Sequence, residues 1–148
     1  MGLLRVNGPN GKRLRSLSSE VTDPSIEVEP YVEEAYRVMS RESGIGIAAP
    51  QISVFYRWYV TPTMGIVINP TITNKENSVS IIEGCVPMPG KWFETTRYKN
   101  ITLEYYDIEM NHNIKEYEDY ESFVVQHEVD HLDGILISDH GERKYSGE

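Results

Sequence analysis

The pattern of hydrophobic and polar positions predicts an amphipathic helix over residues 24–43. Apolar side chains recur there every three or four residues, and charged side chains fall between them. This spacing puts the apolar side chains on one face of a helix, which would pack against the rest of the protein. Gly44 is well placed to end that helix. Residues 1–23 hold turn-forming and basic residues, so we expect an extended segment there rather than a separate domain.

The middle of the chain carries the signals of a β-sheet. Short runs that are apolar or alternate between apolar and polar residues are separated by turn-forming residues, and the short connections favour antiparallel pairing. The polar tail over residues 141–148 is expected to fray. The expected strands are residues 54–60, 66–69, 79–82, 101–107, 114–117 and a final short strand at 135–137.

A second helix is predicted over residues 120–132, where apolar side chains are frequent and Gly134 follows the last turn. Its apolar character indicates a helix in the middle of a domain. We therefore expect an α+β fold with antiparallel strands wrapped around one central buried helix, in a single domain over residues 1–148.

Composition narrows the class of protein. The 148 residues are enough for one core, and 39% apolar with 25% charged residues is ordinary for a globular domain. A net charge of −9 argues against nucleic-acid binding. The single cysteine cannot form an internal disulfide, and we see no leader sequence or apolar run of membrane length. A cytoplasmic protein without a membrane partner is the expectation.

The central helix carries candidate chemistry in the pattern H-E-x-x-H, from His127 to His131. Residues four apart share one face of a helix, so the two imidazoles can hold one metal ion. Glu128 directly follows the first histidine and is placed to act on a water bound to that metal.

A catalytic metal usually has three protein ligands and one open position. The thiol of Cys85 is the preferred third ligand, because Gly84 before it allows a close approach of the backbone, and a thiolate with two imidazoles suits zinc or ferrous iron. His140 and Glu142 in the polar tail are the alternatives. A lone cysteine can also be a small buried hydrophobic residue.

Residues 44–51 contain two glycines and two alanines, which mark a backbone that another group approaches closely. They can also be no more than a helix end and a tight turn. In a functional interpretation, the amide of Gln51 would donate to a developing oxyanion.

Together, these three stretches resemble the peptide deformylases. The family carries G-x-G-x-A-A-x-Q, E-G-C-x-S and Q-H-E-x-D-H-x-x-G motifs in this order, which correspond here to residues 44–51, 83–87 and 126–134. The resemblance spans about residues 3–140. It implies hydrolysis of the N-formyl group of nascent peptides that begin with formylmethionine, with release of formate.

The resemblance also implies roles for individual residues. Cys85, His127 and His131 would hold a metal, typically Fe²⁺ in this family, with Zn²⁺, Ni²⁺ or Co²⁺ as substitutes. Glu128 would serve as general base and then as acid, and Gln51 with the backbone N–H of Val86 would stabilise the oxyanion. Arg97 would pair with Glu83 or Asp130. The methionine side chain and the peptide backbone would be bound by Ile45, Gly46, Ile81, Tyr120, Phe123 and Val124.

The chain departs from the family pattern in two places. Pro87 stands where the family has serine, which removes a hydroxyl and an N–H but keeps the N–H of Val86. The chain also ends soon after the metal helix, whereas many bacterial members carry a further C-terminal helix implicated in ribosome attachment. We therefore expect a short form that works near the ribosome without docking directly on it.

Two other functions remain open on the sequence. A general metallopeptidase would take its third ligand from the tail, so that replacing Cys85 would leave metal affinity intact. A catalytically silent protein with a structural metal would tend to close the fourth position and would have no use for Glu128 as a base. Pro87 is the feature in favour of the silent protein.

Overall fold

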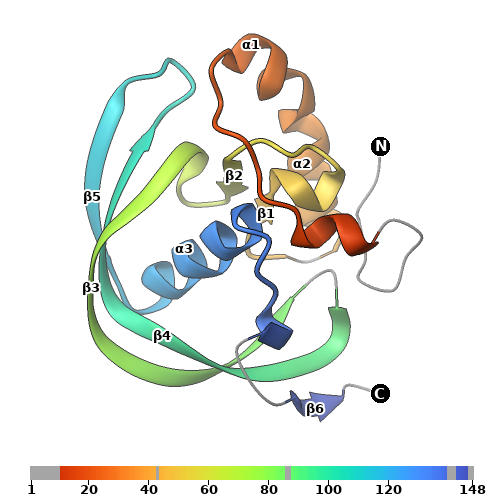
Figure 1. The fold of residues 1–148 in the computed structure, drawn as a ribbon, viewed down its shortest axis with the longest axis vertical. Helices are drawn as coiled ribbons and strands as arrows, with labels where there is room; N and C mark the ends of the chain where they lie inside the picture. Colours follow the sequence, from red (N-terminus) through yellow and green to blue (C-terminus); the bar gives the residue numbers. More distant parts are fainter. Residues whose placement is uncertain (1–10, 43, 86–87, 140–142, 147–148) are drawn as a thin grey trace.

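A computed structural model gives the structure of residues 11–42, 44–85, 88–139 and 143–146. The predicted α+β class is confirmed: antiparallel strands curve around one central helix (Figure 1). The strands pair in the order β1-β2-β3-β4-β5, and β6 pairs with another part of β4. Their bounds are β1 Ile47–Ala48, β2 Trp58–Thr61, β3 Gly65–Cys85, β4 Met88–Tyr106, β5 His112–Glu118 and β6 Arg143–Ser146.

The two longest strands, β3 and β4, form a hairpin that curls around the central helix (Figure 1). We predicted separate strands at residues 66–69 and 79–82, which is wrong, because β3 runs unbroken through both for 21 residues. The polar residues between them face solvent while their backbone pairs with β4. A register shift between Ile68 and Thr71 accommodates Pro70, which cannot donate a ladder hydrogen bond.

The first predicted helix is two helices, α1 Pro24–Glu27 and α2 Glu29–Arg41. Asp23 caps α1 by accepting the N–H of Ser25 at 3.1 Å. The helix is interrupted at Val28 (φ −125°), shortly before Pro30. Proline has no N–H for the carbonyl four residues earlier, so one regular helix cannot run through this point.

The central helix, α3 Asp119–Leu132, matches the prediction. Most of its side chains from Ser122 onward are buried. Gly134 follows it with φ +72°, in the left-handed region that favours glycine. A Cβ atom there would also collide with the backbone carbonyl of Arg15, at the end of the 3₁₀ helix η1 Gly11–Arg15. The turn after α3 therefore requires glycine.

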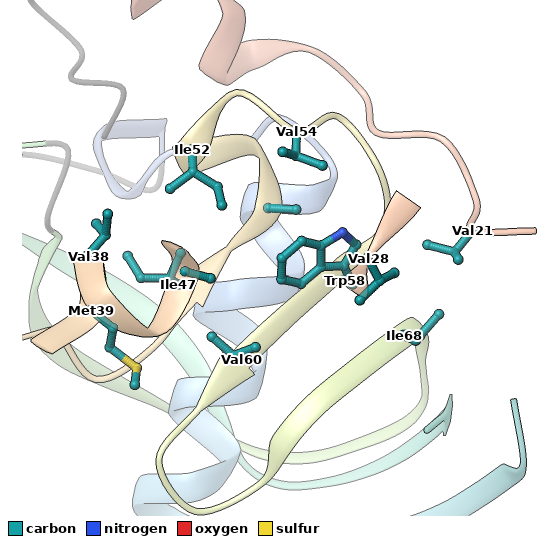
Figure 2. Close-up of a cluster of buried hydrophobic side chains, with 12 residues drawn as sticks. Val21, Val28, Val38, Met39, Ile47, Ile52, Val54, Trp58, Val60 and Ile68 are labelled. Carbon is teal, nitrogen blue, oxygen red and sulfur yellow. The ribbon is translucent and has the colours of Figure 1, made fainter. Parts of the chain in front are cut away.

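Two apolar clusters hold these elements in place. One cluster joins α2 to β1, β2 and η2 (Ala49–Ile52), with Trp58 at its centre (Figure 2). The indole N–H of Trp58 donates to the carbonyl of Glu27 at 3.0 Å, which ties α1 to the sheet. The second cluster lies between α3 and the curved hairpin, and includes Val125, Val129 and Leu132. Within the described residues, no helix is long and apolar enough to cross a membrane.

The C-terminal region corrects two predictions. The strand expected at residues 135–137 is not formed: residues 135–136 are irregular, and Ile137 begins the 3₁₀ helix η3 Ile137–Asp139. Asp139 accepts the N–H of Leu136 at 2.9 Å, and this local bond favours a turn. Its carboxylate also pairs with Arg15 at 2.7 Å, which holds the turn against the N-terminal region. The tail expected to fray contains β6, which pairs with β4 over Lys91–Phe93. After α3, the described residues therefore form η3 and β6.

Candidate active site

The helix α3 brings His127 and His131 onto one face, one turn apart. Both side chains are buried, and their ring centroids lie 5.0 Å apart at an interplanar angle of 71°. Burial lowers the pKa of His131 well below its usual value, so this imidazole is neutral. Neutral imidazoles are the form that binds metal ions.

Glu83 on β3 orients the first of these histidines. Its Oε1 atom lies 2.6 Å from Nδ1 of His127, and its side chain is also largely buried. A carboxylate on Nδ1 fixes the tautomer and the direction of the ring, which makes Nε2 the nitrogen for a metal ion.

Arg97 on β4 joins the β3 strand to α3. Its Nε donates to Glu83 Oε2 at 2.5 Å, and its Nη1 donates to Asp130 Oδ2 at 2.6 Å. The predicted pairing of Arg97 is thus confirmed for both candidate partners. Thr95 adds a hydroxyl hydrogen bond to Glu83 Oε2. Burial by itself raises the pKa of Glu83, but the bonds from His127 and Arg97 outweigh it and hold this pKa far below the usual value.

Glu128 is the buried acid of the site. Only 1% of it is exposed, and among the described residues no hydrogen-bond partner lies within reach of its Oε1 atom. Burial raises the pKa of this carboxyl to about 7. A general base or acid that works near neutral pH needs a pKa in this range.

Gly46 makes room for that carboxylate. A Cβ atom at this position would lie 2.9 Å from Glu128 Oε2 and 3.1 Å from the carbonyl oxygen of Val60. The glycine-rich segment therefore meets the H-E-x-x-H helix at its glutamate. The close approach expected from the sequence is explained by this contact.

Gln51 lies in η2, directly after this segment, and is 1% exposed. Its side-chain oxygen accepts the N–H of Ala48 at 2.9 Å. This bond fixes which end of the amide faces Ala48 and directs the NH₂ donors away from it.

These side chains fit a divalent metal ion. Two buried imidazoles lie on one helix face, one of them carries a carboxylate on its other nitrogen, and a buried glutamate adjoins them. Among the described side chains, no three His, Cys, Asp or Glu residues group as a metal site. The thiol of Cys85 and the alternatives His140 and Glu142 lie outside the described part.

Comparison with known proteins identifies the family and the fold of the chain. The family model of polypeptide deformylase matches residues 4–146 of the chain. This chain belongs to the polypeptide deformylase family. Members of the family are metal-dependent hydrolases that remove the N-formyl group of nascent peptides, and the prediction made from the three motifs is confirmed.

Individual deformylases resemble the chain over most of its length. The peptide deformylase of Finegoldia magna is 33% identical over 145 residues, which cover 94% of this chain and 90% of that protein. The Thermotoga maritima enzyme has a crystal structure that matches with a TM-score of 0.86 at 32% identity, covering 96% and 98% of the two chains. The enzyme from Vibrio parahaemolyticus bacteriophage VP16T, in complex with actinonin, matches with a TM-score of 0.83 at 32% identity, covering 93% and 100%.

The residues expected to bind substrate differ in exposure. Gly46 and Val124 are buried, Ile81 and Phe123 are half-buried, and Ile45 and Tyr120 are exposed. Val86, which was expected to donate its backbone N–H, lies outside the described residues together with Pro87.

No role was expected for Gln126 from the sequence, and Glu83 was expected only as a partner of Arg97. In this deformylase fold, Glu83 also contacts His127, and the amide of Gln126 contacts the backbone of β4. Alternation along the strands could have indicated the first contact, because Glu83, Thr95 and Arg97 are polar residues at inward-facing positions. No local signal in the sequence indicated the contact of Gln126 with β4.

Proposed function

We propose that the chain deformylates peptides that begin with N-formylmethionine, using a divalent metal held by Cys85, His127 and His131. The observation that carries this proposal is the pair of buried imidazoles beside the buried carboxylate of Glu128, whose Oε1 has no hydrogen-bond partner among the described residues. The backbone of Gly46 lies against the same carboxylate. Membership of the deformylase family supplies the substrate class.

Cys85 is the proposed third ligand because β3 ends at this residue, two positions after Glu83, whose carboxylate holds His127. Two nitrogens and one thiolate suit Fe²⁺ or Zn²⁺. We propose Fe²⁺ as the metal in the cell, with Zn²⁺, Ni²⁺ or Co²⁺ as substitutes. With Fe²⁺, activity should fall rapidly in air through oxidation of the iron and of the Cys85 thiol.

Glu128 is the proposed proton carrier. When bound, the metal would acidify a water molecule and polarise the formyl oxygen. Glu128 would accept a proton as this water adds to the formyl carbon, and would then deliver it to the amide nitrogen as the C–N bond breaks. The products are formate and a peptide with a free amino group. A carboxyl with a pKa of about 7 can both accept and release that proton near neutral pH.

The remaining site residues would bind and orient the peptide. The amide N–H of Gln51 and the backbone N–H of Val86 would donate to the oxyanion that forms on the formyl oxygen. The Gly46 backbone would pair with the substrate as a strand does. The methionine side chain would contact Ile45, Ile81, Tyr120, Phe123 and Val124.

The cellular context follows from this substrate. We propose a single catalytic domain that works in the cytoplasm on peptides emerging from ribosomes, without direct docking on the ribosome or contact with nucleic acid. The net charge of −9 supports the last point, since RNA would repel such a protein. Of the two other functions, a general metallopeptidase would draw its third ligand from the tail. Family membership favours deformylation over both that function and a silent metal site.

The test is formate release from a formyl-Met tripeptide by protein prepared without oxygen and loaded with Fe²⁺. Glu128→Ala is the blank, and Cys85→Ser tests the third ligand. We expect turnover by the parent, a loss of several orders of magnitude in Glu128→Ala, and weakened metal binding in Cys85→Ser. A parent that binds metal and is folded but releases no formate would overturn the proposed function.

A further inference from the structure

The strand β4 has an interval along one edge that no described strand covers. It pairs with β6 through Lys91–Phe93 and with β5 from Asn100 onward. Tyr98 lies between these two pairings, opposite Ser78 of β3 on the other side. A backbone at such a place must find other partners for its N–H and C=O groups.

The side chain of Gln126 supplies those partners. Its Oε1 accepts the N–H of Tyr98 at 2.9 Å, and its Nε2 donates to the carbonyl of Tyr98 at 2.8 Å. The amide therefore makes the two hydrogen bonds that a neighbouring strand would make. The Ser122 hydroxyl also donates to the Tyr98 carbonyl, at 2.7 Å, and Gln126 Nε2 lies 3.0 Å from that hydroxyl.

This contact lies directly beside the hydrogen-bonded network formed by Arg97, Glu83, Asp130 and His127. Gln126 precedes His127 on α3, and Tyr98 follows Arg97 on β4. Arg97 in turn holds Asp130, one turn beyond Gln126, and Glu83, which holds His127. On β4, Arg97 thus contacts Asp130 of α3, and the adjacent Tyr98 contacts Gln126. These two contacts fix both the rotation of the helix and its position along the strand.

We propose that Gln126 is a positioning residue, which locks α3 in register on β4 so that His127 Nδ1 meets Glu83. This inference rests on the proposed role of His127 as a metal ligand. The ion pairs alone define the register poorly, since Arg97 has five donors on a long side chain and Glu83 accepts through either oxygen. The amide of Gln126 contacts backbone atoms, which cannot move without moving the strand.

The experiment compares Gln126→Met, which keeps the length of the side chain but removes both hydrogen bonds to Tyr98, with the parent. In the metal-free proteins, hydrogen exchange of the Tyr98 amide shows whether the contact is lost. In the metal-loaded proteins, a chelator in excess gives the rate of metal dissociation. We expect dissociation to be about 10-fold faster or more in Gln126→Met, the range found when a group that orients a metal ligand is removed.

A double-variant cycle separates positioning from a general loss of stability. If Gln126 acts through the Glu83–His127 contact, then Gln126→Met should add little in a Glu83→Gln background. The combined effect would be smaller than the product of the two single effects. Effects that multiply fully would overturn the proposal, as would unchanged metal dissociation in Gln126→Met once the Tyr98 amide exchanges freely.

Asn69 offers a matched control. Its side-chain amide binds the backbone of Val21 in the same way: it accepts the N–H of Val21 at 2.8 Å and donates to the carbonyl of Val21 at 2.9 Å. Asn69→Asp removes the donor there and should destabilise the fold without a change in metal dissociation. A parent that holds no metal or releases no formate would count against the proposed function. A parent that does both, with an unaffected Gln126→Met variant, would count against this inference alone.

Discussion

Glu83 Oε1 lies 2.6 Å from His127 Nδ1, and this contact joins two motifs that are 44 residues apart in the sequence. The carboxylate is itself held by Arg97 and Thr95, so it cannot turn away from the histidine without breaking those bonds. His127, as the proposed metal ligand, would thus be oriented before the metal binds, which would lower the free-energy cost of forming the site.

Removing the charge of Glu83 should weaken metal binding. Glu83→Gln keeps the size of the side chain but loses the carboxylate that orients His127, and we expect metal affinity to fall by about 10- to 100-fold. Competition with a chelator of known affinity measures the change. An unaltered affinity would show that the contact has no part in holding the metal.

Adding one methyl group at Gly46 should damage catalysis more than folding. In Gly46→Ala the new Cβ would lie 2.9 Å from Glu128 Oε2 and 3.1 Å from the Val60 carbonyl, so the carboxylate must shift. A displacement on the order of 1 Å at a catalytic group can cost about 100-fold in rate. We expect kcat for formate release to fall by about that factor. A kcat within twofold of the parent would contradict the close approach.

Arg97 is the buried charge on which the network depends. It is 2% exposed, and Arg97→Met would remove the guanidinium that pairs with both Glu83 and Asp130. We expect the free energy of unfolding, measured in urea on metal-free protein, to fall by about 3–5 kcal/mol.

The control for this variant is Lys99→Met. Lys99 pairs with Asp119 at 3.9 Å, and the two side chains are 49% and 68% exposed. An exposed ion pair of this kind contributes about 0–1 kcal/mol. Equal losses in Arg97→Met and Lys99→Met would refute the special role of the buried network.

The contribution of Glu128 to the stability of the metal-free protein should fall as the pH rises towards 7. Because burial raises the pKa of Glu128 from the usual 4.5 to about 7, the folded state binds the proton more tightly than the unfolded state. The stabilisation is complete below pH 4.5 and is lost as the pH passes through 7. The shift corresponds to a loss on the order of 3 kcal/mol across this window.

Urea unfolding of the metal-free protein at several pH values measures this loss. In Glu128→Gln the side chain cannot ionise, so the stability of the parent relative to this variant should fall between pH 4.5 and 7. Parallel curves for the parent and Glu128→Gln would mean that the carboxyl does not titrate in this window.

The sequence by itself determined the elements whose signals are local. The frequent apolar side chains over residues 120–132, with Gly134 after them, predicted α3. The four-residue spacing of His127 and His131 predicted that both imidazoles lie on one face of this helix. Gly134 was recognised as the end of α3, because its left-handed conformation is a property of a single residue. Three motifs in the family's order were enough to predict the reaction.

Only the tertiary structure decided how the motifs meet. The continuity of β3 through its polar middle depends on pairing with β4, and the β6 strand depends on the edge that β4 leaves open. The contact of Gln126 with Tyr98 joins residues 28 positions apart in the chain. Such contacts leave no period or spacing in the sequence, because they depend on where the folded backbone brings distant groups together.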